Sequence, residues 1–261
     1  MGFPRPDPAA TAVVTGASSG IGMELARLIA ADGHNVTLVA RREERLRDLA
    51  HELRSVHRVR AEILPCDLTD AAERAELARD LPLRVDVLVN NAGFATGGPF
   101  HESDLEDELQ QVRLLCEAPV DLLRRFLPGM VERRAGAVIN VTSTAGMQPL
   151  PNSAGYAAVK AHLLSLSEAV HTEVRRFGVH VTALCPPPVR TELFEKEDHP
   201  VERIPRFAWL DPDDVAEAGW EGAKANKRVV VPGAVARVTS PIARFAPRAI
   251  QLRLVERAFR T

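Results

Sequence analysis

Short apolar runs rich in valine, isoleucine and leucine alternate along the chain with longer segments of helical spacing. In the charged stretch 43–53, for example, Leu46, Leu49 and Leu53 recur every three or four positions. The apolar runs that we interpret as strands are residues 11–15, 36–40, 60–64, 85–90, 137–142, 179–184 and 228–231. Nearly continuous apolar strands separated by helices are typical of a parallel sheet covered on both faces. The pattern therefore predicts an α/β fold with a three-layer, doubly wound parallel sheet.

Helical spacing fills the intervals between these strands. We expect helices at residues 23–31, 43–53, 69–81, about 103–130, 153–177 and from Asp211 onward. No repeat or long linker divides the chain, so we expect a single domain over residues 1–261, with an N-terminal tail at 1–10. The pattern loosens after residue 186, and residues 234–261 form an Arg-rich, partly helical C-terminal extension.

The charge is small overall and unevenly distributed. Lys+Arg is 33 and Asp+Glu is 35, and the net charge of −2 argues against a general nucleic-acid-binding protein. Residues 228–261 nevertheless hold seven arginines and one glutamate, which gives +6 against −8 for the rest. Only four basic residues are lysines, so each lysine deserves to be located.

Several classes of site and location are disfavoured. Cys66, Cys116 and Cys185 are far apart without CxxC spacing, which does not indicate a disulfide scaffold or a zinc site. The eight histidines form no H-x-x-x-H pair, and we expect no metal. No early stretch resembles a signal peptide, and the longest uncharged stretch, 135–159, is interrupted by proline and asparagine. We therefore expect a cytoplasmic protein without a transmembrane segment.

A glycine-rich turn, Thr15-Gly16-Ala17-Ser18-Ser19-Gly20-Ile21-Gly22, joins the first strand to the first helix. Glycines there permit a tight turn, the approach of a pyrophosphate to the backbone, and close helix packing. The helix N-terminus offers free N–H groups to an anion. The turn could also be a plain strand–helix junction, but this context favours a nucleotide. The expected contacts are Gly16, Ser18, Ser19, Gly20 and Ile21.

The end of the second strand indicates which dinucleotide binds. An acidic residue there would accept a hydrogen bond from a ribose 2′-hydroxyl, but this chain has Ala40-Arg41-Arg42. Two guanidinium groups suit a 2′-phosphate, so NADP(H) is favoured over NAD(H). The alternative is that Arg41 and Arg42 are solvated residues at a helix start, where cations are mildly unfavourable.

These motifs together resemble the short-chain dehydrogenase/reductase family, closely over residues 12–192. The matching residues are the turn at 15–22, Cys66-Asp67-Leu68, Asn90-Asn91-Ala92-Gly93, Ser143, Tyr156-Ala157-Ala158-Val159-Lys160, Pro186 and Thr191. The resemblance implies a Rossmann-type fold and oxidoreductase chemistry. It also implies that Asp67 and Leu68 lie against adenine, and that Val189 and Thr191 hold the nicotinamide carboxamide. The remaining implied cofactor contacts are Asn90, Ala92, Gly93, Tyr156 and Lys160.

By this resemblance, Ser143, Tyr156 and Lys160 form the catalytic group. Tyr156 and Lys160 are four residues apart and share a helix face. The lysine ammonium favours the ionised phenol and lowers its pKa from about 10. Tyr156 can then act as general acid in reduction and general base in oxidation, while Ser143 holds the substrate oxygen. Tyr156 is the only tyrosine of the chain, which favours this role over that of a half-buried aromatic residue.

Two positions depart from the family pattern. Leu115 stands where related enzymes carry an asparagine that holds a water for proton relay. Gln111, one turn earlier, could partly substitute, but we favour an exposed Gln111 and a different relay. Pro187 replaces a glycine and removes a backbone N–H. These departures leave an alternative function, an NADP(H)-binding protein of low turnover with a regulatory or binding role.

The substrate and the assembly are less defined by sequence. The family's substrate loop corresponds to the start of the region 192–226, and its apolar residues suit a lipophilic ketone or β-ketoacyl compound: Leu193, Phe194, Ile204, Phe207, Trp209 and Leu210. Residues 234–261 could lie at a membrane surface, or pack on the domain or another subunit, which we favour. Family members usually form homo-oligomers through the helices at 103–130 and 153–177, and we expect the same here.

Overall fold

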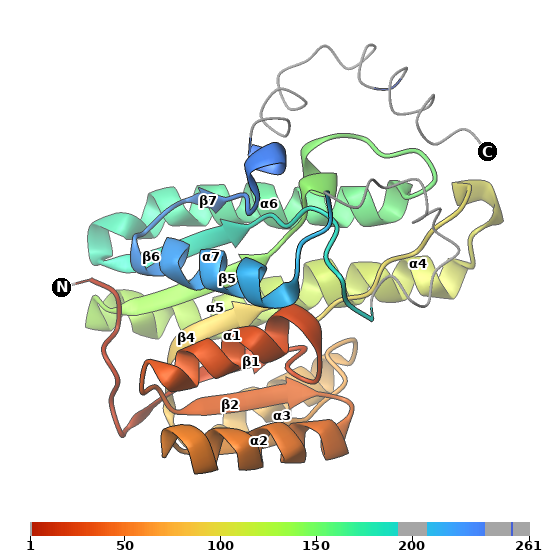
Figure 1. Cartoon of the computed structure of the whole chain (residues 1–261). Coiled ribbons are helices and arrows are strands. Elements are labelled where there is room, and N and C mark those ends of the chain that lie inside the picture. Colours follow the sequence, from red (N-terminus) through yellow and green to blue (C-terminus); the bar gives the residue numbers. More distant parts are fainter. Residues whose placement is uncertain (1, 193–207, 238–251, 253–261) are drawn as a thin grey trace.

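A seven-stranded parallel sheet forms the centre of the molecule (Figure 1). The computed structural model describes residues 2–192, 208–237 and 252. The strands follow the order β3-β2-β1-β4-β5-β6-β7. Their bounds are β1 Ala10–Thr15, β2 Val36–Ala40, β3 Ala61–Pro65, β4 Arg84–Asn90, β5 Gly136–Val141, β6 Val179–Leu184 and β7 Val229–Val230. The predicted three-layer α/β fold is confirmed, and the predicted strands all appear within a residue or two of their expected bounds.

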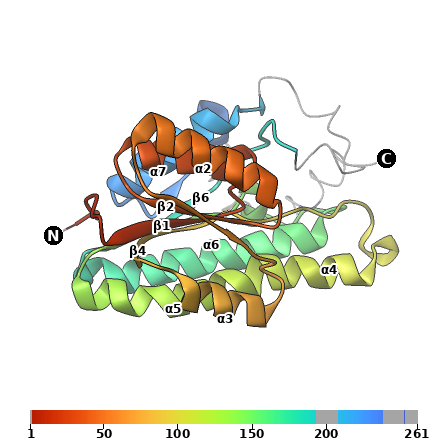
Figure 2. The ribbon, with the colours of Figure 1, turned by 90° about the horizontal axis from the view of Figure 1, so that it is seen from below.

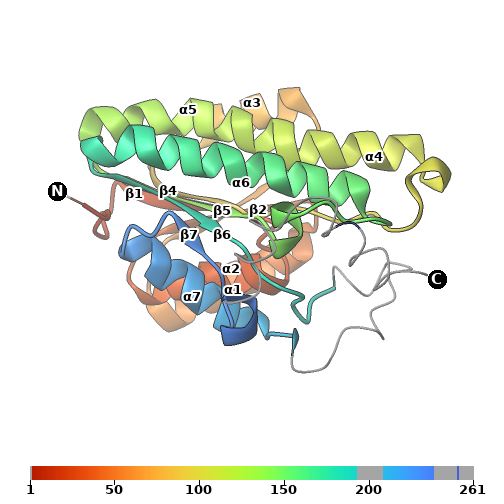
Figure 3. The same cartoon turned by 90° about the horizontal axis from the view of Figure 1, so that it is seen from above.

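Helices cover both faces of this sheet (Figures 2 and 3). Helices α1 Gly20–Ala31, α2 Glu43–His57 and α7 Pro212–Lys224 lie on one face. The other face carries α3 Ala71–Asp80, α4 Leu105–Val112, α5 Ala118–Arg133 and α6 Ala154–Val174. The apolar positions that predicted α2, Leu46, Leu49 and Leu53, are all buried against the sheet.

The long helix expected over residues 103–130 is divided. A π-helical turn, Arg113–Glu117, separates α4 from α5 without ending the helical path. Pro119 offers a physical reason, because it has no N–H to donate to the carbonyl of Leu115 in a regular α-helix. The helix expected at 153–177 is α6 followed by a short 3-10 turn, Arg175–Phe177.

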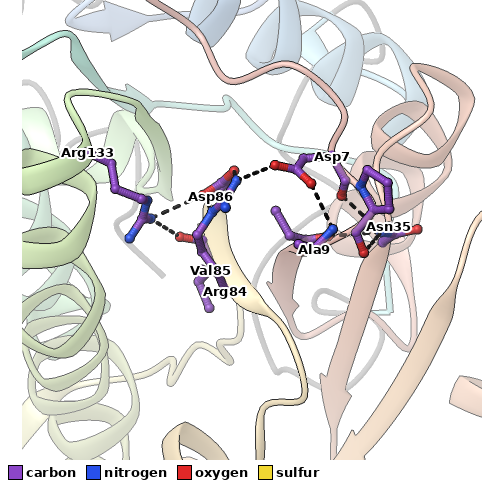
Figure 4. A network of polar contacts seen from close by, with 9 residues as sticks. Asp7, Ala9, Asn35, Arg84, Val85, Asp86 and Arg133 are labelled. Atoms are coloured by element: carbon purple, nitrogen blue, oxygen red, sulfur yellow. Dashed lines mark hydrogen bonds and ion pairs between the residues drawn. The ribbon is translucent and has the colours of Figure 1, made fainter.

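A polar network closes the amino end of the sheet (Figure 4). Arg84 donates to Asp7 at 2.7 Å and to Asp86 at 2.9 Å. Arg133 of α5 donates to the Val85 carbonyl at 2.9 Å and to Asp86 at 3.1 Å. The buried carboxylate of Asp86 is thus held by two guanidinium groups, which joins the N-terminal segment, β4 and α5.

An aromatic cluster joins the same N-terminal segment to α7. The Phe3 ring packs edge-on against Trp220, with centroids 4.9 Å apart, and also contacts His34 and His180. Trp220 is almost fully buried and donates its indole N–H to Asp32 at 2.7 Å. Residues near both ends of the described chain are therefore packed together beside the sheet.

The strand order reverses direction between β1 and β4, which are direct neighbours. In open α/β sheets of this kind, the ligand crevice lies at the carboxyl ends of the strands at that point. The fold thus directs attention to the residues that follow β1 and β4.

Candidate active site

A cavity of about 1220 Å³ lies at the carboxyl ends of the strands. It brings together nearly all the site residues expected from sequence. Those that line it are Gly16, Ser18, Ser19, Gly20, Ile21, Arg41, Arg42, Asp67, Leu68, Ala92, Gly93, Ser143, Tyr156, Lys160, Val189 and Thr191.

Asn90 is placed differently from its neighbours. Its side chain is buried beneath the cavity and donates to Asn140 at 2.8 Å, and Asn140 donates in turn to Ser167 of α6 at 2.8 Å. The next residue, Asn91, lines the cavity instead and donates to the carbonyls of Thr15 and Gly16. Asn90 therefore holds β4, β5 and α6 together, and Asn91 supports the glycine-rich turn.

The glycine-rich turn has the geometry expected for close approach of a phosphate. Gly16 has a positive φ of 65°, and a Cβ there would lie 2.8 Å from the Ala92 Cα. A Cβ on Gly22 would collide with the Asn91 side chain and the Gly16 carbonyl. The Thr15 hydroxyl accepts the N–H groups of Asn91 and Ala92 at 2.9 and 3.1 Å, which fixes this turn against the end of β4.

Two arginines, Arg41 and Arg42, line the cavity beside the glycine-rich turn. Arg42 donates to the Ser18 hydroxyl at 2.8 Å and to the Ser19 hydroxyl at 2.7 Å, so its guanidinium group lies on the glycine-rich turn. Partial burial of the Asp67 carboxyl opposes its ionisation, but hydrogen bonds from Thr69 and the positive charge of the nearby Arg41 lower its pKa overall. A phosphate on the ribose would meet fixed cationic donors here.

The catalytic candidates come from the end of β5 and the first turns of α6. Ser143 begins a short 3-10 helix, Thr144–Met147, and its hydroxyl accepts the Ala145 N–H at 3.1 Å. Tyr156 is half-buried in the first turn of α6 and lines the cavity. The Lys160 ammonium lies 5.6 Å from the centroid of the Tyr156 ring. The i, i+4 spacing on one helix face thus places the two groups together as predicted.

Lys160 is buried, with only 5% of its surface exposed. Its ammonium donates to the Val141 carbonyl at 2.9 Å, at the end of β5. Burial lowers the pKa of Lys160 to about 8, because the low-dielectric surroundings disfavour the charged form. A lysine of this kind still carries its charge near neutral pH and can stabilise a phenolate beside it.

The structure contradicts the expectation that Gln111 is exposed. Gln111 is fully buried, and its amide donates to the Thr96 hydroxyl at 2.8 Å, which donates to Glu108 at 2.9 Å. The Gln111 Oε1 atom is buried without a hydrogen-bond partner among the described residues. The helix that carries Gln111, α4, is packed against α6, and that packing cannot be seen from the sequence of one helix. Leu115, one turn later, packs against Gly93.

The segment after β6 is held in place on both sides of Pro187. The Pro186 carbonyl accepts the Thr144 N–H at 2.9 Å, and Val189 pairs with Leu210 in a parallel bridge. The cavity is lined by all three prolines, 186–188, as well as by Val189 and Thr191. The missing N–H at position 187 is therefore accommodated by fixing the chain on either side of it.

Sequence reasoning missed part of the wall opposite the glycine-rich turn. The additional lining residues include Phe94, Asp107, Gln110, Leu114, Met147, Gln148, Leu150 and Ala234. Residues 147–150 could have been predicted, because they follow the carboxyl end of β5, where such sheets bind ligands. Of the expected substrate loop, Leu210 lines the cavity and Trp209 does not. Leu193, Phe194, Ile204 and Phe207 lie outside the described residues, as does most of 234–261.

Within the described ranges, no cluster of three or more His, Cys, Asp or Glu side chains could hold a metal ion. The same residues contain no helix long and apolar enough to span a bilayer.

A parallel sheet with a glycine-rich turn, arginines beside that turn and a Tyr–Lys pair in the same cavity is typical of a dinucleotide-dependent oxidoreductase. The family described as short chain dehydrogenase matches residues 10–202. The chain therefore belongs to the short-chain dehydrogenase family, and it is an NAD(P)-dependent oxidoreductase.

Known proteins resemble this chain over most of its length. The NADP-dependent 3-hydroxy acid dehydrogenase YdfG of Escherichia coli is 35% identical over 218 residues, which are 80% of this chain and 86% of that protein. The short-chain dehydrogenase from Sphingobium yanoikuyae, solved in complex with NADPH, is 31% identical with a TM-score of 0.81, covering 94% of this chain and 95% of that one. The bulky-bulky ketone specific alcohol dehydrogenase from Comamonas testosteroni is 28% identical with a TM-score of 0.77, covering 94% of each chain.

Proposed function

We propose that this protein is an NADP(H)-dependent carbonyl reductase that converts a bulky, apolar ketone or β-ketoacyl compound to an alcohol. The observation that carries the proposal is one cavity with Arg42, Ser18 and Ser19 at one end and Ser143, Tyr156 and Lys160 at the other. Relatives that are named for NADP or solved with NADPH support the choice of cofactor. NADPH bound in this cavity would supply the hydride.

The residues of the chain supply the proton and the orientation. Ser143 holds the carbonyl oxygen of the substrate, and Tyr156 donates its phenolic proton to that oxygen as the alkoxide forms. The Lys160 ammonium stabilises the resulting phenolate, which is the physical reason for a cation beside the ring. In the reverse direction the same phenolate removes the proton of the alcohol.

The substrate end of the cavity supports an apolar substrate. Its described wall is rich in apolar side chains, namely Phe94, Leu114, Met147, Leu150 and Leu210. The alcohol dehydrogenase from Comamonas testosteroni is described as specific for bulky-bulky ketones, which agrees with such a wall.

We also propose that the protein is cytoplasmic and that it forms a homo-oligomer. The oligomer is supported by an exposed apolar stripe along α4, where Leu105, Leu109 and Val112 are 73%, 41% and 42% exposed. Contact of the C-terminal extension with lipid is not part of the proposal, because most of that segment lies outside the described residues.

NADPH oxidation with a panel of aromatic ketones, aliphatic ketones and β-ketoacyl thioesters tests the proposal. We expect turnover of the bulky, apolar members with NADPH, and weaker turnover with NADH. Replacing Tyr156→Phe should reduce turnover at least ~100-fold, since it removes the proton donor and little volume. The variant should still bind NADPH in a fluorescence titration, because the glycine-rich turn and Arg42 are unchanged.

The outcome that opposes the proposal is equally clear. NADPH binding without oxidation across the whole panel would favour a cofactor-binding protein of low turnover instead. Full turnover by the Tyr156→Phe variant would remove Tyr156 from the reaction.

A further inference from the structure

Glu192 bridges two arginines at the adenosine end of the cavity. One oxygen of its carboxylate accepts from Arg42 Nη1 at 2.5 Å, and the other accepts from Arg45 Nη1. Arg45 lies one turn after Arg42 at the start of α2, so the two guanidinium groups share a side of the helix. The paired arginines lower the pKa of the Glu192 carboxyl, which stays ionised near neutral pH.

Arg42 is the residue that joins this ion pair to the cofactor site. Its Nε and Nη2 atoms donate to Ser18 and Ser19 on the glycine-rich turn, and its Nη1 atom donates to Glu192. A 2′-phosphate on a ribose bound beside this turn would need the same guanidinium face. The carboxylate and the phosphate are thus ligands for one set of donors.

The backbone directly before Glu192 is held in place by contacts with the rest of the fold. The side chain of Thr191 rests on the turn, since a Cβ on Gly20 would lie 2.9 Å from the Thr191 Cγ2. Arg190 donates its N–H to the Leu210 carbonyl at 3.0 Å and pairs with Asp211 at 2.8 Å. Glu192 therefore starts from a fixed position directly beside the two arginines.

We propose that the Glu192 carboxylate is an exchangeable counter-ion that competes with the 2′-phosphate of NADP(H) for Arg42 and Arg45. The inference rests on the proposed use of NADP(H). A phosphate with nearly two charges and three acceptor oxygens outcompetes a single carboxylate. The 2′-hydroxyl of NAD(H) is neutral and leaves the ion pairs intact. Glu192 thus lowers affinity for the phosphorylated cofactor alone and speeds its release.

Solvent exposure sets the size of the effect. The side chains of Glu192, Arg42 and Arg45 are 36%, 42% and 49% exposed, so the ion pairs are weak and screened by salt. Losing this competition should tighten NADPH binding about three- to tenfold, the range expected when one or two exposed ion pairs no longer need to be broken.

The test compares dissociation constants of NADPH and NADH for the wild type, Glu192→Gln and Glu44→Gln. Glu44 is a matched control, because it is an exposed glutamate in the first turn of α2 that makes no ion pair among the described residues. We expect Glu192→Gln to tighten NADPH about three- to tenfold at low salt, with less gain at high salt. NADH binding should change less than about twofold, and Glu44→Gln should leave both cofactors within about twofold.

Adenosine 2′,5′-bisphosphate and adenosine 5′-monophosphate isolate the phosphate from the rest of the cofactor. The Glu192→Gln variant should bind the bisphosphate more tightly than the wild type does, as it should NADPH. Its affinity for the monophosphate should be unchanged. Unchanged or weaker NADPH binding in Glu192→Gln overturns the inference while leaving the proposed function intact. A wild type that does not prefer NADPH over NADH overturns the proposed cofactor and this inference together.

Discussion

At the scale of single residues, Lys160 carries a charge in a place that disfavours it. Its ammonium is buried and donates to the Val141 carbonyl. The lowered pKa of about 8 means that the folded chain holds this charge at a free-energy cost. The proposed chemistry requires the charge, so function and stability oppose each other at this position.

Replacing Lys160→Met should raise the melting temperature of the cofactor-free protein at pH 7. In the wild type, the lysine destabilises the fold fully below pH 8, because the folded pKa lies below the unfolded value of 10.5. That destabilisation fades as the pH rises from 8 to 10.5. We expect the free energy of unfolding to increase by about 1–3 kcal/mol at pH 7 and by less at pH 10. Reductase activity should be lost.

Lys224→Met is the matched control for this measurement. Lys224 is partly exposed and pairs with Glu221 and Asp32, and the hydrogen bonds to these two carboxylates raise its pKa. Its replacement should bring no gain in melting temperature. A gain for Lys160→Met that grows between pH 7 and pH 10 would contradict the argument.

The closeness of Tyr156 and Lys160 could be predicted from sequence, but the directions in which the side chains of Asn90 and Asn91 point could not. Tyr156 and Lys160 are brought together by helix periodicity alone. The side chains of Asn90 and Asn91 point in different directions because side chains alternate at the end of β4. The sequence alone does not show which of the two faces the cavity. Glu192 was missed for another reason, since its partners Arg42 and Arg45 are distant in sequence and meet it only in the fold.

At the scale of elements, the division of the long helix was beyond the sequence pattern. Periodicity predicted one helix, and a π-turn shifts the phase of the residues that follow it. Leu115 lies in this turn, 1% exposed, with its side chain against Gly93 and outside the cavity wall. The small cavity beside it is lined mainly by apolar residues such as Leu122 and Leu163, together with Thr15 and Asn90.

Replacing Leu115→Asn should destabilise the protein by about 2–4 kcal/mol, because a buried amide takes the place of an apolar side chain. Chemical denaturation measures this change. The pH profile of turnover by the folded variant should match the wild type, since the position does not line the cavity.

Leu115→Met provides the comparison, because it conserves volume and should cost less than about 1.5 kcal/mol. A Leu115→Asn variant as stable as Leu115→Met would show that the pocket around this residue accepts polar groups. An altered pH profile would instead connect the position to proton transfer.

At the scale of the whole molecule, the parallel sheet and its three layers followed from the alternation of strands and helices. The packing of Phe3 did not, because residues 1–10 have no periodic pattern that would assign them to the fold. In the structure, Phe3 contacts Trp220, His34 and His180, and Asp7 joins the network of Arg84 (Figure 4). The expected tail is thus part of the folded body.

Replacing Phe3→Ala should lower the free energy of unfolding by about 1–3 kcal/mol, somewhat less than for a fully buried phenylalanine. Thermal unfolding monitored by circular dichroism measures the loss. Phe100→Ala is the control, because Phe100 is 62% exposed and its removal should change little. Equal melting temperatures for Phe3→Ala and the wild type would show that the aromatic contacts contribute no net stability.

The contact between Phe3 and Trp220 also sets an order of events during synthesis on the ribosome. Phe3 is made long before two of its three ring partners, His180 and Trp220. A nascent chain that stops before α7 therefore leaves this ring, and the sheet face that α7 covers, open to chaperones and proteases. Closure of this part of the fold therefore waits until α7 has been made.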